Sequence, residues 1–156
     1  FDKTMQFHFN GERIDLMHFG AAHTTGDTAV IFRVHNAVHM GDEYNNSAYP
    51  YIDAGNGGKF DGVIKFCSKT LKQIDENTVV IPGHGPISDY QGLADYTEML
   101  TIIHERMMAL IDNGASLEDV YAAKVTKEWD KKQGNPTGFS NRAYMSLTHR
   151  VLIDKR

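Results

Sequence analysis

Thr78-Val79-Val80-Ile81-Pro82-Gly83-His84-Gly85 joins a short apolar run to a glycine-rich turn that carries a histidine. The run predicts a buried β-strand, and the glycines allow the backbone to turn sharply where that strand ends. Two earlier stretches have the same form, His23-Thr24-Thr25-Gly26-Asp27 and His39-Met40-Gly41-Asp42. Each places a histidine or a carboxylate where a strand meets a loop, so we expect these side chains to gather at one edge of a sheet.

His23, Asp42 and His84 together form a candidate metal-ligand set. Zn²⁺ takes histidine nitrogen and aspartate oxygen in roughly tetrahedral sites. The ligands are nineteen and forty-two residues apart, which indicates separate loops, and the single cysteine excludes a zinc finger. Taken alone, each has an ordinary role: a loop hydrogen bond for His23, a loop cap for Asp42 and a tight turn around His84. Their shared position after three strand ends favours the metal.

Alternating residues predict two β-hairpins in the first forty positions. Residues 4–9 and 13–19 flank Asn10-Gly11, a strong hairpin signal because both turn positions tolerate positive φ. Residues 28–34 and 37–40 flank a second turn at His35-Asn36. A further strand is expected at residues 78–81.

Apolar residues at helical spacing predict helices over 60–74 and about 91–113. A capping box at Ser116 opens another helix, and a last one is expected from about Ser140, after the break at 135–138. The fold class is therefore α/β (α+β), with a mainly antiparallel sheet and flanking helices. The helices come late and do not close a two-layer core, so a missing half of the fold would explain this order.

Composition limits the function classes. The chain has 156 residues, 41% of them hydrophobic and 23% charged, as in an ordinary soluble globular domain. The net charge of −4 and the absence of a basic stripe argue against nucleic-acid binding, and no apolar run approaches the ~20 residues of a membrane helix. Opening at Phe1 without an initiator Met suggests a piece of something larger. Cys67 is expected to be a small buried hydrophobe.

The three motifs resemble the later motifs of the metallo-β-lactamase-fold hydrolases, in particular the bacterial branch with Gly-Asp and Pro-Gly-His-Gly. The resemblance implies an αββα sandwich with a metal site, usually of two zinc ions. In that site His23 would complete one metal's histidine set, Asp42 would bridge both metals as the catalytic carboxylate, and His84 would ligate the second metal. A metal-bound hydroxide would attack an ester, amide, thioester or phosphoester in a small-molecule substrate.

The family's first motif, His-x-His-x-Asp-His, has no counterpart in this sequence. We therefore expect residues 1–156 to be the C-terminal half of such a domain, with an incomplete zinc site and poor activity alone. The expected partner is the missing N-terminal half or a second copy, which predicts a homo-oligomer if the chain is stable alone. The alternative is a non-catalytic scaffold or self-associating interaction domain. Localisation stays open, although the resembling branch is often exported to the bacterial periplasm.

Residues around the ligand set have two possible roles each. Asp27 either supports a ligand imidazole or the His23 loop, or simply caps that loop. The segment after Asp42 either walls a substrate pocket or is a packed connector; its candidate pocket residues are Tyr44, Asn45, Tyr49 and Tyr51. The electropositive anchors that a β-lactam carboxylate would need are not identifiable in the sequence, where Lys59 and Lys65 are minor candidates, and the substrate itself cannot be assigned.

Overall fold

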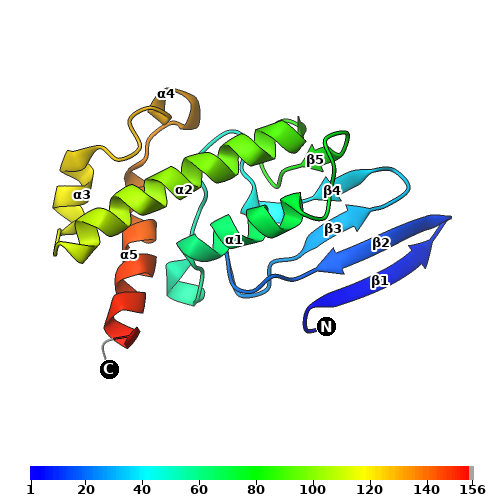
Figure 1. The fold of residues 1–156 in the computed structure, drawn as a ribbon, viewed down its shortest axis with the longest axis horizontal. Helices are drawn as coiled ribbons and strands as arrows, with labels where there is room; N and C mark the ends of the chain where they lie inside the picture. Colours follow the sequence, from blue (N-terminus) through cyan, green and yellow to red (C-terminus); the bar gives the residue numbers. More distant parts are fainter. Residues whose placement is uncertain (155–156) are drawn as a thin grey trace.

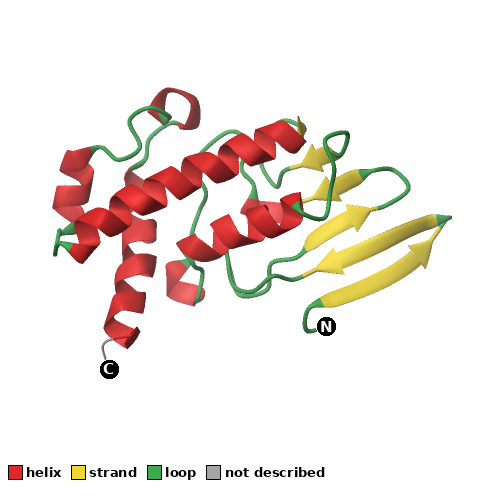
Figure 2. Cartoon of the chain, in the orientation of Figure 1, coloured by secondary structure: helices red, strands yellow, loops and turns green. Residues whose placement is uncertain are grey.

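A six-stranded sheet and five α-helices make an α+β fold (Figures 1 and 2). The computed structural model describes the backbone of residues 1–154 and the side chains of residues 1–148. The strands, in chain and spatial order, are β1 (Thr4–Phe9), β2 (Glu12–Met17), β3 (Ala29–Phe32), β4 (Ala37–His39), β5 (Val79–Ile81) and β6 (Ser88–Asp89). The helices are α1 (Phe60–Leu71), α2 (Tyr90–Asp112), α3 (Leu117–Ala123), α4 (Asp130–Gln133) and α5 (Thr137–Asp154), with 3₁₀ turns η1 (Gly41–Glu43) and η2 (Ala54–Asn56).

Both predicted hairpins form. β1 pairs antiparallel with β2, and Asn10 and Gly11 turn between them with φ of 49° and 75°. β3 pairs antiparallel with β4, and Asn36 in the connecting turn has φ of 47°. The sheet is thus mainly antiparallel with flanking helices, and the predicted fold class is confirmed.

β4 and β5 are a parallel pair, with α1 in the connection between them. Val38 pairs with Val80, and His39 pairs with Ile81. Because parallel strands end at the same edge of a sheet, the residues that follow His39 and Ile81 emerge side by side. The short antiparallel β6 completes the sheet next to β5. The sequence did not predict β6, because two residues are too few to show a period.

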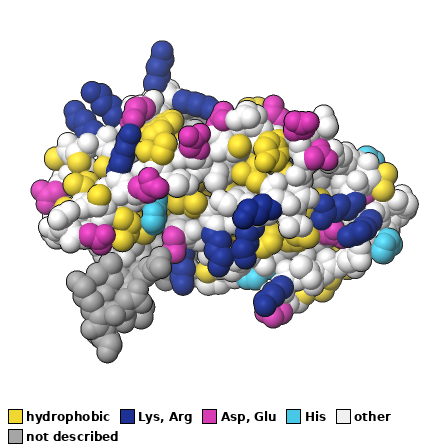
Figure 3. Space-filling model, viewed as in Figure 1, with side chains coloured by type: hydrophobic (Ala, Val, Ile, Leu, Met, Phe, Trp, Pro, Cys, Tyr) yellow, Lys and Arg dark blue, Asp and Glu magenta, His cyan; other side chains and the backbone are white. Residues whose placement is uncertain are grey.

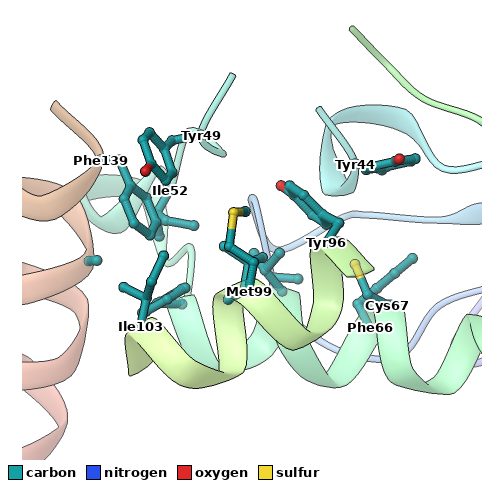
Figure 4. Close-up of a cluster of buried hydrophobic side chains, with 14 of the residues drawn as sticks. Tyr44, Tyr49, Ile52, Phe66, Cys67, Tyr96, Met99, Ile103 and Phe139 are labelled. Atoms are coloured by element: carbon teal, nitrogen blue, oxygen red, sulfur yellow. The ribbon is translucent and has the colours of Figure 1, made fainter. Parts of the chain in front are cut away.

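One face of the sheet is buried under α1 and α2. Ile31, Val38 and Val80 point to this face and belong to one core cluster with residues of both helices, among them Phe66 and Leu100. Figure 4 shows part of this core, including Cys67 on α1. Cys67 is fully buried, as predicted, and burial raises the pKa of its thiol.

The opposite face of the sheet is apolar and partly open to solvent. On β1, Phe7 and Phe9 point to this face with 46% and 67% of their surface exposed. The register places Ile14 of β2 beside Phe7, and Phe32 of β3 beside Ile14, on the same face. At the other side of the sheet Val79 of β5 is 42% exposed. We call these five residues, with Met5, the open face.

The C-terminal helices pack on α1 and α2. Ser116 and Asp119 form the predicted capping box of α3. The last helix begins at Thr137, three residues before the predicted start, because the Asn135 side chain accepts a hydrogen bond from the Thr137 N–H. The short α4 was not predicted. None of the helices in residues 1–154 has the length and hydropathy to cross a membrane.

Candidate functional site

His23, Asp42 and His84 lie together at the sheet edge where β4 and β5 end. Asp42 Oδ1 is 3.0 Å from Nε2 of His84, and its Oδ2 is 3.5 Å from Nε2 of His23. The Asp42 carboxylate thus stands between the two imidazoles, with one oxygen toward each. Among the residues described, no group of three or more His, Cys, Asp and Glu side chains could hold a metal ion as the side chains stand.

The Asp42 turn and the His84 loop are joined through their backbones. The Gly83 N–H donates to the carbonyls of Gly41 (2.8 Å) and Tyr44 (3.1 Å). A Cβ at Gly83 would lie 2.5 Å from the Gly41 carbonyl and 2.6 Å from Asp42 Oδ1. The close approach that brings His84 to Asp42 therefore requires glycine at position 83.

The ring of His23 is held from the side that faces away from Asp42. Its Nδ1 lies 2.5 Å from the backbone carbonyl of Tyr51. A carbonyl can only accept a hydrogen bond, so Nδ1 is the donor in this contact and Nε2 is the nitrogen that faces Asp42. The backbone of Gly58 also lies close to His23. A Cβ at position 58 would lie 2.4 Å from the His23 carbonyl, so this approach requires glycine. The loop between Tyr51 and Gly58 thus orients the imidazole toward Asp42.

Glu43 is a buried carboxyl group directly beneath the site. Its side chain accepts a hydrogen bond from the His23 N–H (2.8 Å), and only 1% of its surface is exposed. Burial, helped by the charge of Asp27, raises the pKa of Glu43 to about 9. Glu43 is therefore neutral at pH 7 and supports the His23 loop without adding charge to it. Sequence reasoning missed this residue, since nothing in Gly41-Asp42-Glu43 distinguishes the inward carboxylate from the outward one.

Asp27 holds the His23 loop in shape. Its carboxylate accepts hydrogen bonds from the N–H and the hydroxyl of Thr24, both at 2.8 Å. The His23 imidazole is bonded to the Tyr51 carbonyl instead. These contacts fit a role of Asp27 in supporting or capping the His23 loop. They do not include a hydrogen bond from the Asp27 side chain to the His23 imidazole.

Three of the four candidate pocket residues lie in packed surroundings. Tyr44 is 1% exposed and its hydroxyl is 2.9 Å from the Ser88 hydroxyl. Tyr49 is buried, and its ring stacks on Phe139 (Figure 4). Asn45 accepts three hydrogen bonds from Ser47 and Ala48 within its own turn. These contacts fit the packed-connector interpretation, and a role of the three residues toward a substrate stays a prediction.

Tyr51 is different, because half of its surface is exposed and its ring lies 5.8 Å from the ring of His23. It is the residue of the predicted set that stands at the surface beside His23. Lys59 begins α1 next to this loop, where its N–H donates to the Ala22 carbonyl. Lys65 is exposed on α1.

Comparison with solved structures identifies the fold. The structures that superpose on the chain are metallo-β-lactamase-fold proteins, and their architecture matches the α+β sheet and helices described above. One is the stereoselective inverting sec-alkylsulfatase Pisa1 from Pseudomonas sp., with a TM-score of 0.74 and 16% identity over 92% of this chain. Another is a metallo-β-lactamase from Pontibacter korlensis, with a TM-score of 0.56 and 18% identity over 65% of this chain. The DIM-1 metallo-β-lactamase has a TM-score of 0.54 and 20% identity over 64%.

The chain spans only part of these proteins: 25% of Pisa1, 47% of the Pontibacter enzyme and 45% of DIM-1. No protein-family profile and no curated protein matches the sequence. The structural neighbours are hydrolases of the metallo-β-lactamase superfamily, and at these identities the likeness establishes the fold.

Proposed function

We propose that residues 1–156 are the C-terminal half of a metal-dependent hydrolase of the metallo-β-lactamase superfamily, in which His23, Asp42 and His84 contribute to a zinc site. The observation that carries the proposal is the position of the Asp42 carboxylate between two imidazole Nε2 atoms, at 3.5 and 3.0 Å. The fold of the structural neighbours supports the same class of chemistry.

The spacing of these atoms suits zinc. Two donors that each lie ~2.0 Å from a tetrahedral zinc ion stand ~3.3 Å apart. The two nitrogen–oxygen distances lie on either side of that value. Each oxygen of Asp42 faces a different imidazole, which supports a role in which Asp42, His23 and His84 would together hold the metal.

The residues of this chain prepare the donors. The Tyr51 carbonyl accepts a hydrogen bond from Nδ1 of His23, and Nε2 is the nitrogen that faces Asp42. The buried Glu43 holds the His23 backbone, and Asp42 is the carboxyl group that lies beside the two imidazoles. Bound zinc would supply a nucleophile at neutral pH, because it lowers the pKa of a coordinated water to ~7.

Three donors shared between two metal positions leave each metal short of the four ligands that zinc prefers. The remaining donors would come from the N-terminal half of the domain. The whole protein would then hydrolyse an ester, amide, thioester or phosphoester, and residues 1–156 alone would bind zinc loosely and turn over poorly.

Elemental analysis of the intact protein and calorimetric zinc titration of residues 1–156 test the proposal. We expect at least one zinc per intact protein, weak zinc binding by the wild-type chain, and at least a tenfold loss for Asp42→Asn. The matched control is Asp112→Asn, an exposed aspartate at the end of α2 that should not affect zinc. Absence of metal above background in the intact protein would refute the proposal.

The open face favours a second candidate, a self-associating domain without catalysis. Phe7 and Phe9 expose apolar rings on an edge strand, whose unpaired backbone groups invite pairing with another strand. Size-exclusion chromatography with light scattering tests this candidate for residues 1–156. A homodimer that binds no zinc would favour the scaffold, and a compact monomer would contradict it.

A further inference from the structure

A cavity of about 390 Å³ lies between α2, α4 and the loop that follows Asp42. Its buried part is formed by the side chains of Tyr96 and Met99 on α2 and of Gln133 on α4. Figure 4 shows Tyr96 and Met99 on the same side of α2. None of the three candidate metal ligands lines the cavity. A space of this volume suits a small molecule, so the cavity is a candidate site of its own.

The elements around the cavity are anchored to one another. Arg106 of α2 pairs with Glu128 through two hydrogen bonds of 2.7 Å, and its guanidinium carbon lies 5.4 Å from the centre of the Trp129 ring. On the other side, the Tyr49 hydroxyl donates to Asp130 Oδ1 at 2.9 Å. These contacts fix α4 and Trp129 relative to α2, and the shape of the cavity is therefore set by the fold.

Two buried polar atoms in the cavity lack partners. Tyr96 and Gln133 are 4% and 6% exposed, and neither the Tyr96 hydroxyl nor Oε1 of Gln133 forms a hydrogen bond of ordinary geometry with a described residue. The backbone N–H of Asn45 is a donor toward the Tyr96 oxygen, which leaves the hydroxyl proton unpaired. Burial raises the pKa of Tyr96, so the hydroxyl keeps this proton. Since buried polar groups normally have partners, the pair points to a ligand with one acceptor and one donor.

The other lining residues limit the shape and charge of such a ligand. The wall is apolar and consists of Met99, Ile102 and Trp129. The exposed rim is charged and consists of Asp95, Glu98 and Lys132. Figure 3 shows hydrophobic side chains between acidic and basic ones at the upper edge of the view, where Figure 1 places α4 beside α2. Two acidic groups against one basic group disfavour an anion.

We infer that this cavity is a binding site for an uncharged aromatic carboxamide. The carbonyl of the ligand accepts a hydrogen bond from the Tyr96 hydroxyl, and its NH₂ group donates to Oε1 of Gln133. A carboxamide carries this acceptor and this donor on one carbon atom, and its ring packs on Met99 and Trp129. The site shares no residue with the proposed zinc site and does not depend on it.

Fluorescence titration of residues 1–156, with a chelator present, tests the inference. Trp129 is the only tryptophan of these residues and lines the cavity, so its emission reports binding. The probes are benzamide, benzoate, which has a charged oxygen in place of the NH₂ group, and acetophenone, which has a methyl group there. We expect benzamide to bind about tenfold more tightly than benzoate. Its affinity should exceed that of acetophenone about fivefold, as one hydrogen bond predicts.

Two variants separate the two hydrogen bonds. Tyr96→Phe should weaken benzamide binding about fivefold, and Gln133→Leu should make benzamide and acetophenone bind equally. Because both atoms lack partners among the described residues, neither substitution should lower the urea midpoint of unfolding. Tyr90→Phe is the matched control, since Tyr90 is also on α2 but does not line the cavity. It should bind benzamide as the wild type does.

Three results would overturn the inference: no binding of benzamide at millimolar concentration, affinities for benzoate or acetophenone equal to that for benzamide, or wild-type binding of benzamide by both folded variants. Zinc titration of the same samples distinguishes this inference from the proposed function. If the chain bound benzamide but the intact protein held no zinc, the proposed function would fail and the cavity site would remain. Zinc without benzamide binding would have the opposite meaning.

Discussion

Asp42 and Glu43 are adjacent in the chain, yet their carboxyl groups occupy opposite environments. The Asp42 side chain is 47% exposed between two imidazoles, while Glu43 is 1% exposed beneath the His23 loop. The 3₁₀ turn η1, entered through Gly41 at φ of 58°, directs one outward and the other into the core. The site therefore has one carboxyl group at its surface and a buried one as its support.

The raised pKa of Glu43 predicts a pH-dependent stability in the metal-free chain. Its pKa is about 9 in the folded protein and near 4.5 in the unfolded chain, so the folded state binds the proton more tightly. The contribution of Glu43 to the free energy of unfolding should be complete below pH 4.5 and should fall as the pH rises toward 9, by at most about 1.4 kcal/mol per pH unit. Urea unfolding at pH 6, 7 and 8, with a chelator present, measures this slope.

Glu43→Gln keeps a hydrogen-bond acceptor but cannot ionise, so its stability should vary less with pH than that of the wild type. Glu76→Gln, at an exposed turn position, is the control and should keep the wild-type slope. Equal slopes for Glu43→Gln and the wild type would contradict the assignment of a buried neutral acid.

Gly83→Ala should disturb the site and the fold together. The added methyl group would lie within 2.6 Å of the Gly41 carbonyl and of Asp42 Oδ1, where backbone cannot easily move aside. We expect a loss of about 1–3 kcal/mol in the free energy of unfolding and weaker zinc binding. Gly138→Ala in α5 is the control, because open space surrounds that position, and it should be neutral or stabilising by up to ~1 kcal/mol. Similar effects of the two substitutions would argue against the tight loop contact.

The open face predicts that a charge on β1 reduces self-association. Phe7→Lys removes an exposed ring beside Ile14 without opening the core, so the free energy of unfolding should change by no more than about 0.5 kcal/mol. Light scattering should show a shift toward monomer. Gln6→Lys adds the same charge to the other face of β1 and should leave the oligomeric state unchanged. A dimer that survives Phe7→Lys would place the interface elsewhere.

Tyr49 links the loop after Asp42 to the C-terminal helices. Its hydroxyl donates to Asp130 Oδ1 at 2.9 Å and lies 3.2 Å from the Thr126 carbonyl. Burial and the nearby Asp130 raise the pKa of Tyr49, so the hydroxyl stays protonated and can donate throughout the neutral range. Tyr49→Phe should therefore cost about 1–2 kcal/mol in thermal or urea unfolding. Tyr90→Phe, at the start of α2, should have no comparable effect.

Much of the fold follows from local signals in the sequence. Asn10-Gly11 determines the first hairpin because both residues adopt positive φ, and Ser116 with Asp119 closes a capping box. The meeting of Asp42 and His84 follows from two strands that end at the same edge. Their role as metal ligands stays a prediction.

The parts that were missed depend on contacts between distant segments. The burial of Tyr44 and Tyr49 is set by Tyr96, by Phe139 and by the helices that carry them, and a loop sequence rich in aromatics does not reveal those partners. Gln133 reaches the cavity beside Tyr96 only because α4 is anchored on α2. Tertiary packing, and not spacing along the chain, determines these positions.

The parallel pairing of β4 and β5 links the relative position of Asp42 and His84 to the packing of the interior. A shift of either strand by one residue would turn Val38 or Val80 out of the core, and it would also move Asp42 relative to His84. Selection for a well-packed interior therefore preserves the separation of these two side chains.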